Sequence, residues 1–181
     1  MSADEIEEIT FPATLELLGD RPILRLPQTA SERLPSRGQV AAGGSIGGTD
    51  FTTVVEPDGR RGHWISIDDD LWQRLTSSAG DEVEVRLSPR KDWPEVIVPE
   101  DLREALTDAG DLDEVWQSLT AMARWECVRW IKATKNADTR ARRVDVAISK
   151  LESGKRRPCC FDLSSCTDPE LSKSGKLLGI T

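Results

Sequence analysis

The sequence predicts an α+β protein in which a small, mostly antiparallel β-barrel is followed by an all-helical C-terminal domain. Two observations predict this order. Before residue 99, apolar and polar residues alternate in several short segments, which is the period of a half-buried strand. After it, apolar residues recur every three or four positions, which is the period of an amphipathic helix. We therefore expect a barrel over residues 1–98, a helical domain over 99–157 and a tail over 158–181.

The strands of the expected barrel are marked by short alternating segments that end at turn residues. The clearest alternation involves Val83, Val85 and Leu87, whose neighbours are charged. Five or six short strands without a long strand-helix-strand repeat favour a barrel over a doubly wound sheet. The expected strands are 11–18, 23–26, 40–48, 51–56, 64–67 and 83–87, and the expected short helices are 28–34 and 69–75, the latter capped by Asp68. Residues 96–98 could finish the barrel or act as a linker.

Residues 36–64 combine strand residues with turn residues, so this segment is expected to fold back on itself. Pro57, Asp58 and Gly59 suit a tight turn, because proline presets φ, aspartate bonds its own backbone and glycine accepts a positive φ. The glycines at 43–48 lack the terminal lysine of a phosphate-binding Walker loop and lead into no helix. We interpret them as strand corners.

Four helices are expected after Pro99, each from apolar residues that share one face. The first ends at Gly110, the second covers 112–119, the third is capped by Thr120, and the fourth begins with Asp138 or Thr139 as its cap and ends at Gly154. The remainder mixes proline, serine, glycine and lysine, which is typical of a tail.

Charge is distributed unevenly along the chain. The net charge of −8 argues against general adhesion to nucleic acid. Between Arg124 and Arg157, however, eleven Lys or Arg stand against four Asp or Glu, a local charge of +7 that leaves −15 for the rest. The basic segment is therefore the unusual part of the sequence.

No run of 18 apolar residues is present, and the first residues are acidic where a secretory signal would be basic and then apolar. A soluble, cytoplasmic protein is expected. The four cysteines are few and clustered late, so reduced thiols are expected.

Several motifs in the first half carry a family resemblance. They are LPSRG at 34–38, PDGxxGHW at 57–64, AGDxVxV at 79–85 and WPEVxVPxDL at 93–102. With them the first half resembles a family of unknown function, and the resemblance implies an AbrB/MazE-like double-split β-barrel.

The second half carries WECVRWI at 125–131, ADTRARRV at 137–144 and GKRRPCCF at 154–161. It is similar to the helical domain of the YdeI/OmpD-associated, bacteriocin-protection type. The resemblance implies a role in tolerance of bacteriocins or cationic antimicrobial peptides, and it brings no catalytic residue set.

A basic surface on the third and fourth helices is the first candidate site. Guanidinium groups bind oxyanions bidentately, so such a surface would suit phosphate or an acidic partner. The alternative is that these cations pair with carboxylates of the acidic barrel, because charged surfaces usually serve solvation and weak pairing. The candidate residues are Arg129, Lys132, Lys135, Arg140 and Arg143.

An anion or ligand loop is the second candidate, formed by Arg37, Arg60, Arg61 and His63. His63 is the only histidine and could act as a general base, but no nucleophile or carboxylate motif lies at a catalytic spacing. We favour a structural histidine that bonds to the barrel backbone.

For two further features, a structural role is simpler than a functional one. Trp125 could stack a nucleic acid base, although packing explains a large aromatic side chain more simply. Cys159, Cys160 and Cys166 could bind zinc, but their spacing does not match paired CxxC motifs. We expect no metal and no cofactor.

These observations predict a non-enzymatic binding protein that recognises an acidic macromolecule or an envelope-associated protein through a basic surface. The alternative is an AbrB-like DNA-binding regulator, in which Arg37, Arg60, Arg61, Arg90 and Lys91 would contact phosphates. An enzyme is the weaker third class, because no catalytic constellation is visible.

Overall fold

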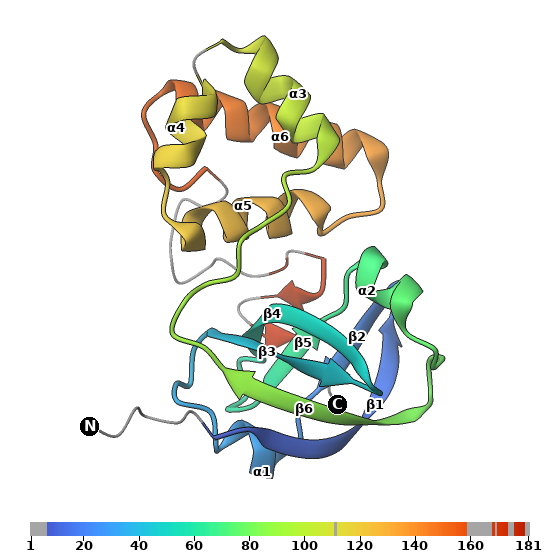
Figure 1. Cartoon of the computed structure of the whole chain (residues 1–181). Helices are drawn as coiled ribbons and strands as arrows, with labels where there is room; N and C mark the ends of the chain where they lie inside the picture. Colours follow the sequence, from blue (N-terminus) through green and yellow to red (C-terminus); the bar gives the residue numbers. More distant parts are fainter. Residues whose placement is uncertain (1–6, 111, 159–167, 169, 174–175, 180–181) are drawn as a thin grey trace, which may run out of the picture. The chain divides into compact units, whose positions relative to one another are not determined.

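The computed structural model describes residues 7–110, 112–158, 168, 170–173 and 176–179 (Figure 1). The chain divides into two compact units. The barrel unit comprises Met1–Pro94 together with Lys176–Thr181, and the helical unit comprises Glu95–Gly175. Each unit is described by itself below.

Six antiparallel strands close the barrel unit in the order β1-β2-β5-β4-β3-β6 (Figure 1). This confirms the expected mostly antiparallel barrel. The strands are β1 (Ile9–Leu18), β2 (Arg21–Arg25), β3 (Val40–Ile46), β4 (Thr49–Pro57), β5 (His63–Ser66) and β6 (Glu82–Pro89). Two short helices, α1 (Gln28–Ser31) and α2 (Asp69–Arg74), lie between strands. As expected, Asp68 caps α2, accepting a 2.8 Å hydrogen bond from Leu71 N.

The apolar residues that alternate along the strands point into the barrel, and the polar residues between them face outward. In β6, Val83, Val85 and Leu87 are buried while their charged neighbours are exposed, and β1 shows the same pattern opposite it. Burying these side chains removes apolar surface from water, which is the main force that stabilises the barrel.

Gly44 shows why β3 is rich in glycine. It lies inside the strand, paired with Leu87 of β6, and a Cβ atom there would come 1.9 Å from the backbone oxygen of Arg86. The two backbones approach too closely for any side chain. The glycine therefore permits strand pairing within the barrel.

The helical unit contains α3 (Glu100–Asp108), α4 (Leu112–Ser118), α5 (Ala121–Lys132) and α6 (Ala137–Glu152). Helix α6 packs against the other three around one core. Thr120 caps α5, as expected, by accepting a hydrogen bond from Ala123 N. The cap of α6 is Asn136 rather than Asp138 or Thr139, because the Asn136 side chain accepts a 2.9 Å hydrogen bond from Thr139 N and the helix starts two or three residues earlier than expected.

The end of the chain differs from the expected tail. Two short strands, β7 (Ser172–Lys173) and β8 (Lys176–Leu177), follow α6, so the region after the fourth helix contains strands. In the barrel unit, Leu177 N donates to Asp58 O at 3.0 Å and the Arg25 guanidinium donates to Leu178 O at 3.3 Å. Leu177 is buried. The local sequence pattern does not predict this strand, because the strand is held in place by contacts with residues far away in the chain.

Candidate functional site

The loop between β4 and β5 is built around the carboxylate of Asp58. One carboxylate oxygen accepts hydrogen bonds from Arg60 N at 2.7 Å and Gly62 N at 2.8 Å, while Asp58 N donates to Gly62 O at 3.0 Å. A Cβ on Gly62 would lie 2.4 Å from the same carboxylate. Because its aspartate is turned onto the backbone, the loop presents Arg60 and Arg61 to solvent.

Arg61 has a φ of 72°, and it is the one non-glycine residue with a positive φ among the residues that the structure describes. A side chain in this left-handed region is uncommon and costs about 1 kcal/mol or more. The surrounding hydrogen bonds hold the strained conformation in place.

Arg37 ties this loop to the end of α1. Its guanidinium donates to Arg61 O at 3.4 Å and to Ser31 O. The side chain remains exposed although the guanidinium is anchored. We call Arg37, Arg60 and Arg61 the basic loop.

His63 lies beneath the basic loop with 1% of its surface exposed. Its Nε2 is 3.0 Å from Gly38 O, and its Nδ1 is 2.7 Å from the Ser31 hydroxyl oxygen. A carbonyl only accepts, so Nε2 carries the proton and Nδ1 accepts from Ser31. Burial lowers the pKa of His63, and the nearby charge of Arg37 lowers it further.

The histidine is therefore neutral and has both nitrogens occupied. Neither nitrogen is open to take a proton from a substrate, and Ser31 is itself fully buried. A hollow of ≈ 310 Å³ lies on a different part of the barrel, against β1 and β6, and its polar lining includes Glu82 and Glu84. The geometry around His63 is that of a packed structural cluster.

The predicted helical surface has a different character, which Arg140 illustrates. Its guanidinium binds Asp101 of α3 through both carboxylate oxygens, at 2.7 and 3.2 Å. These hydrogen bonds hold the pKa of Asp101 below its usual value. Arg140 thus joins α6 to α3.

Arg143 is also engaged within the helical unit. It donates to Trp130 O at 2.8 Å, lies over the Trp130 ring at 5.6 Å and comes within 4.0 Å of Glu170. Only 12% of its side chain is exposed. Arg129 lies over the Trp125 ring at 5.4 Å, so that aromatic face is occupied by a cation from the same helix. Lys132 and Lys135 are the exposed members of the predicted surface.

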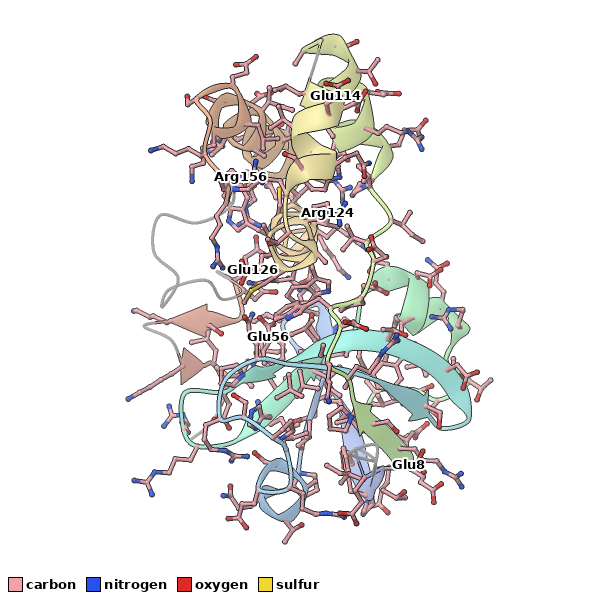
Figure 2. All side chains as sticks on the ribbon, turned by 60° about the vertical axis from the view of Figure 1, so that its left-hand side comes forward. Glu8, Glu56, Glu114, Arg124, Glu126 and Arg156 are labelled. Atoms are coloured by element: carbon pink, nitrogen blue, oxygen red, sulfur yellow. The ribbon has the colours of Figure 1, made fainter. Side chains whose placement is uncertain are left out.

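Three arginines outside the predicted surface are also bound internally. Arg157 pairs with Glu126 of α5, a carboxylate with 1% of its surface exposed, and Arg124 lies 3.8 Å from Glu95. Figure 2 shows Glu126 on α5 and Arg156 in the segment after α6. Arg156 donates to both the hydroxyl and the carbonyl of Ser118 at the end of α4. The spacing of residues in the sequence does not indicate these contacts, and only the excess of acidic residues before α5 suggests them.

That excess of acid is large. Residues 95–123 contain eight Asp or Glu and one Arg, a charge of −7 that balances the +7 of residues 124–157. The positive segment therefore has a negative counterpart inside its own unit.

Seven of the nine arginines between residues 1 and 94 show a contrast. Arg25, Arg33, Arg74 and Arg86 each form an ion pair with a glutamate or aspartate of the same unit. The three arginines of the basic loop form no ion pair within the described part of the chain.

Within the residues described, no group of three His, Cys, Asp or Glu side chains could hold a metal ion. Cys127 is buried, and Cys159, Cys160 and Cys166 lie outside the described residues. Among these residues, no helix has the length and apolar character needed to cross a bilayer.

Two family models match the chain. Residues 11–87 match a family described as a domain of unknown function (DUF1905), and residues 95–154 match one described as "Bacteriocin-protection, YdeI or OmpD-Associated". No curated protein matches the chain. The boundary between the two matches lies where the barrel unit ends and the helical unit begins.

Proposed function

We propose that this chain is a non-enzymatic binding protein with a role in bacteriocin protection, and that it recognises an anionic partner through the basic loop. One observation carries the proposal: Arg37, Arg60 and Arg61 are exposed cations without an ion-pair partner among the described residues, at one end of a closed barrel. The match of residues 95–154 to the bacteriocin-protection family supports the biological role.

Electrostatics favours this loop as a contact surface. Three neighbouring positive charges repel one another, and an incoming anion relieves that repulsion. No internal ion pair has to break before the anion binds. Asp58 and Arg37 hold the loop in place beforehand, which lowers the entropy lost on binding.

The helical unit contributes differently in this proposal. Arg140 and Arg143 hold α6 against α3 and α5, so they shape the helical surface rather than meet the partner. Their bonds to Asp101 and Trp130 O would have to be exchanged for bonds to a partner, with little net gain.

DNA binding is the competing function of the same cations. The barrel segment, residues 1–94, holds 17 acidic and 10 basic residues, a charge of −7. A long polyanion would extend beyond the small basic loop, and the negative charge of the barrel would repel it. A compact anionic group would fit within the loop and avoid this repulsion. We therefore favour a compact anionic group over a duplex.

The test is a fluorescence anisotropy titration of the full chain with a labelled octaglutamate peptide, at low and at high salt. We expect salt-sensitive binding that is lost when Arg60→Glu is combined with Arg61→Gly. Glycine accepts the positive φ at position 61 and removes only the side chain. Arg90→Glu combined with Lys91→Gly is the matched control, because it changes two other exposed cations of the same unit.

Each result has a defined meaning. Peptide binding that depends on the loop and not on the control positions supports the proposal. Binding to a 20-base-pair duplex without peptide binding would favour the DNA-binding alternative, and no binding to either probe would overturn recognition of an acidic macromolecule. The protective role is tested by survival of bacteria that express the wild type or the loop variant under bacteriocin challenge.

A further inference from the structure

We infer that the anion bound at the basic loop is a phosphate group, and that Lys176 of β8 completes the site. The inference rests on the proposed function and makes it more specific, because it names the chemical group and a fourth residue. It is argued from the placement of β8, from the number of charges, and from the acidity of the surrounding barrel.

Strand β8 is fastened directly beside the β4–β5 loop. Leu177 N donates to Asp58 O at 3.0 Å, and Arg25 donates to Leu178 O at 3.3 Å. Leu177 is buried, with 1% of its surface exposed, so this end of the chain is anchored in the barrel unit. The contact places the backbone of Lys176 next to the loop that carries Arg60 and Arg61.

Lys176 adds a fourth cation of the same kind. It is exposed and has no ion-pair partner within the described residues, as holds for the three arginines. The four cations come from three separate segments, since Arg37 follows α1, Arg60 and Arg61 belong to the β4–β5 loop, and Lys176 belongs to β8. Only the folded barrel brings these three segments together.

The number of charges favours phosphate over carboxylate. A carboxylate has one negative charge and two oxygens, whereas a phosphate monoester has up to two charges and three strong acceptor oxygens at neutral pH. Arginine suits such a group because its planar guanidinium donates two parallel hydrogen bonds, and lysine adds a point charge. Three guanidinium groups and one ammonium exceed what a single carboxylate can neutralise.

Asp58, the carboxylate within the loop, is turned onto the loop backbone. Asp58 is occupied by Arg60 N and Gly62 N, so it serves the loop backbone. The next acidic residue along the chain, Glu56, is buried. The negative charge of the remaining barrel limits the site to a compact ligand, which a single phosphate group is.

The test is isothermal titration calorimetry of the full chain with inorganic phosphate, glycerol phosphate and the octaglutamate peptide. Vesicles of phosphatidic acid, with phosphatidylcholine vesicles as the blank, present the same monoester on a lipid. We expect the wild type to bind the phosphate probes more tightly than the peptide. Arg61→Gly and Lys176→Gln should each weaken phosphate binding, by about tenfold for the arginine. Arg103→Gln, at an exposed cation of α3 that belongs to no candidate site, is the control and should leave binding unchanged.

The outcomes separate this inference from the proposed function. Loop-dependent binding of the peptide with no response to any phosphate probe overturns the inference and leaves the proposed function standing. No response to peptide or phosphate overturns both. Phosphate binding that survives Arg61→Gly and Lys176→Gln unchanged also overturns the inference. A preference for phosphatidic acid vesicles over glycerol phosphate, or the reverse, supports the inference and identifies the ligand as lipid-borne or free.

Discussion

Two arginine-rich regions of this protein differ in what their charges do. Between Arg124 and Arg157 the chain is strongly basic, yet Arg140, Arg143 and Arg157 bind groups inside their own unit. The β4–β5 loop lies in an acidic domain, yet its two arginines and the nearby Arg37 form no ion pair within the described residues. Whether a charged side chain can bind a ligand therefore depends on its local partners and not on the net charge of the segment.

The comparison has an energetic side. A buried or partly buried ion pair makes each partner necessary for stability, because removing one leaves the other in a poorly solvated place. Exposed cations without partners contribute little to stability and remain free to bind. Substitutions in the two regions should consequently have opposite effects on folding and on binding.

The largest loss of stability is expected for Arg157→Ala. Glu126 is 1% exposed and would lose its ion pair with Arg157, which should lower the free energy of unfolding by about 3 kcal/mol. Urea denaturation followed by tryptophan fluorescence measures the change. Lys155→Ala, at an exposed neighbouring position, is the control and should change stability by less than about 0.5 kcal/mol. Equal losses of stability in both variants would show that the ion pair between Arg157 and Glu126 does not stabilise the fold.

A smaller loss, about 1 kcal/mol or less, is expected for Arg140→Ala at neutral pH, because Arg140 and Asp101 are 34% and 40% exposed and solvent screens the pair. The lowered pKa of Asp101 makes this contribution pH-dependent. It is present above the ordinary aspartate pKa of 3.8 and disappears as acid protonates the folded carboxylate. Wild type and variant should therefore converge in stability in strong acid, while Arg142→Ala, on the exposed side of α6, should match the wild type throughout. A gap that persists in acid would mean that Arg140 stabilises the helices by packing alone.

The next effect is a gradual loss of barrel stability as pH falls below about 6.5, and it arises from His63. Its pKa is lowered by burial, so the unfolded chain takes up a proton first and acid favours unfolding. Unfolding measured between pH 7.5 and 5 should show this slope in the wild type. His63→Gln, which keeps a donor and an acceptor without a titrating ring, should flatten it. An unchanged slope in the variant would assign the pH dependence to other groups.

The smallest effect is expected in the basic loop. Arg60→Ala with Arg61→Gly should leave the free energy of unfolding within about 0.5 kcal/mol of the wild type, because no ion pair is lost and glycine relieves the positive φ. The same double variant should lose affinity for anions. A clear loss of stability would show that the loop cations hold the barrel together, and the contrast between the two regions would then disappear.

Local pattern was enough to predict much of the secondary structure. Alternation at 11–18 and 83–87 predicts β1 and β6, and apolar spacing at 112–119 predicts α4, because both periods follow from backbone geometry. Thr120 and Asp68 were recognisable as caps for the same reason. The start of α6 was placed too late, since Asn136, Asp138 and Thr139 are all suitable caps and only the folded backbone selects one.

The sequence alone determined the succession of strand and helix, the alternation that fills the barrel, and the Asp58 turn that exposes Arg60 and Arg61, because these depend on residues close together in the chain. Tertiary structure alone decided that Arg140 meets Asp101, that His63 meets Ser31 and Gly38, and that β8 returns to the loop. Such pairs join distant segments, and pairing decides whether a charge stabilises the fold or stays available for a ligand.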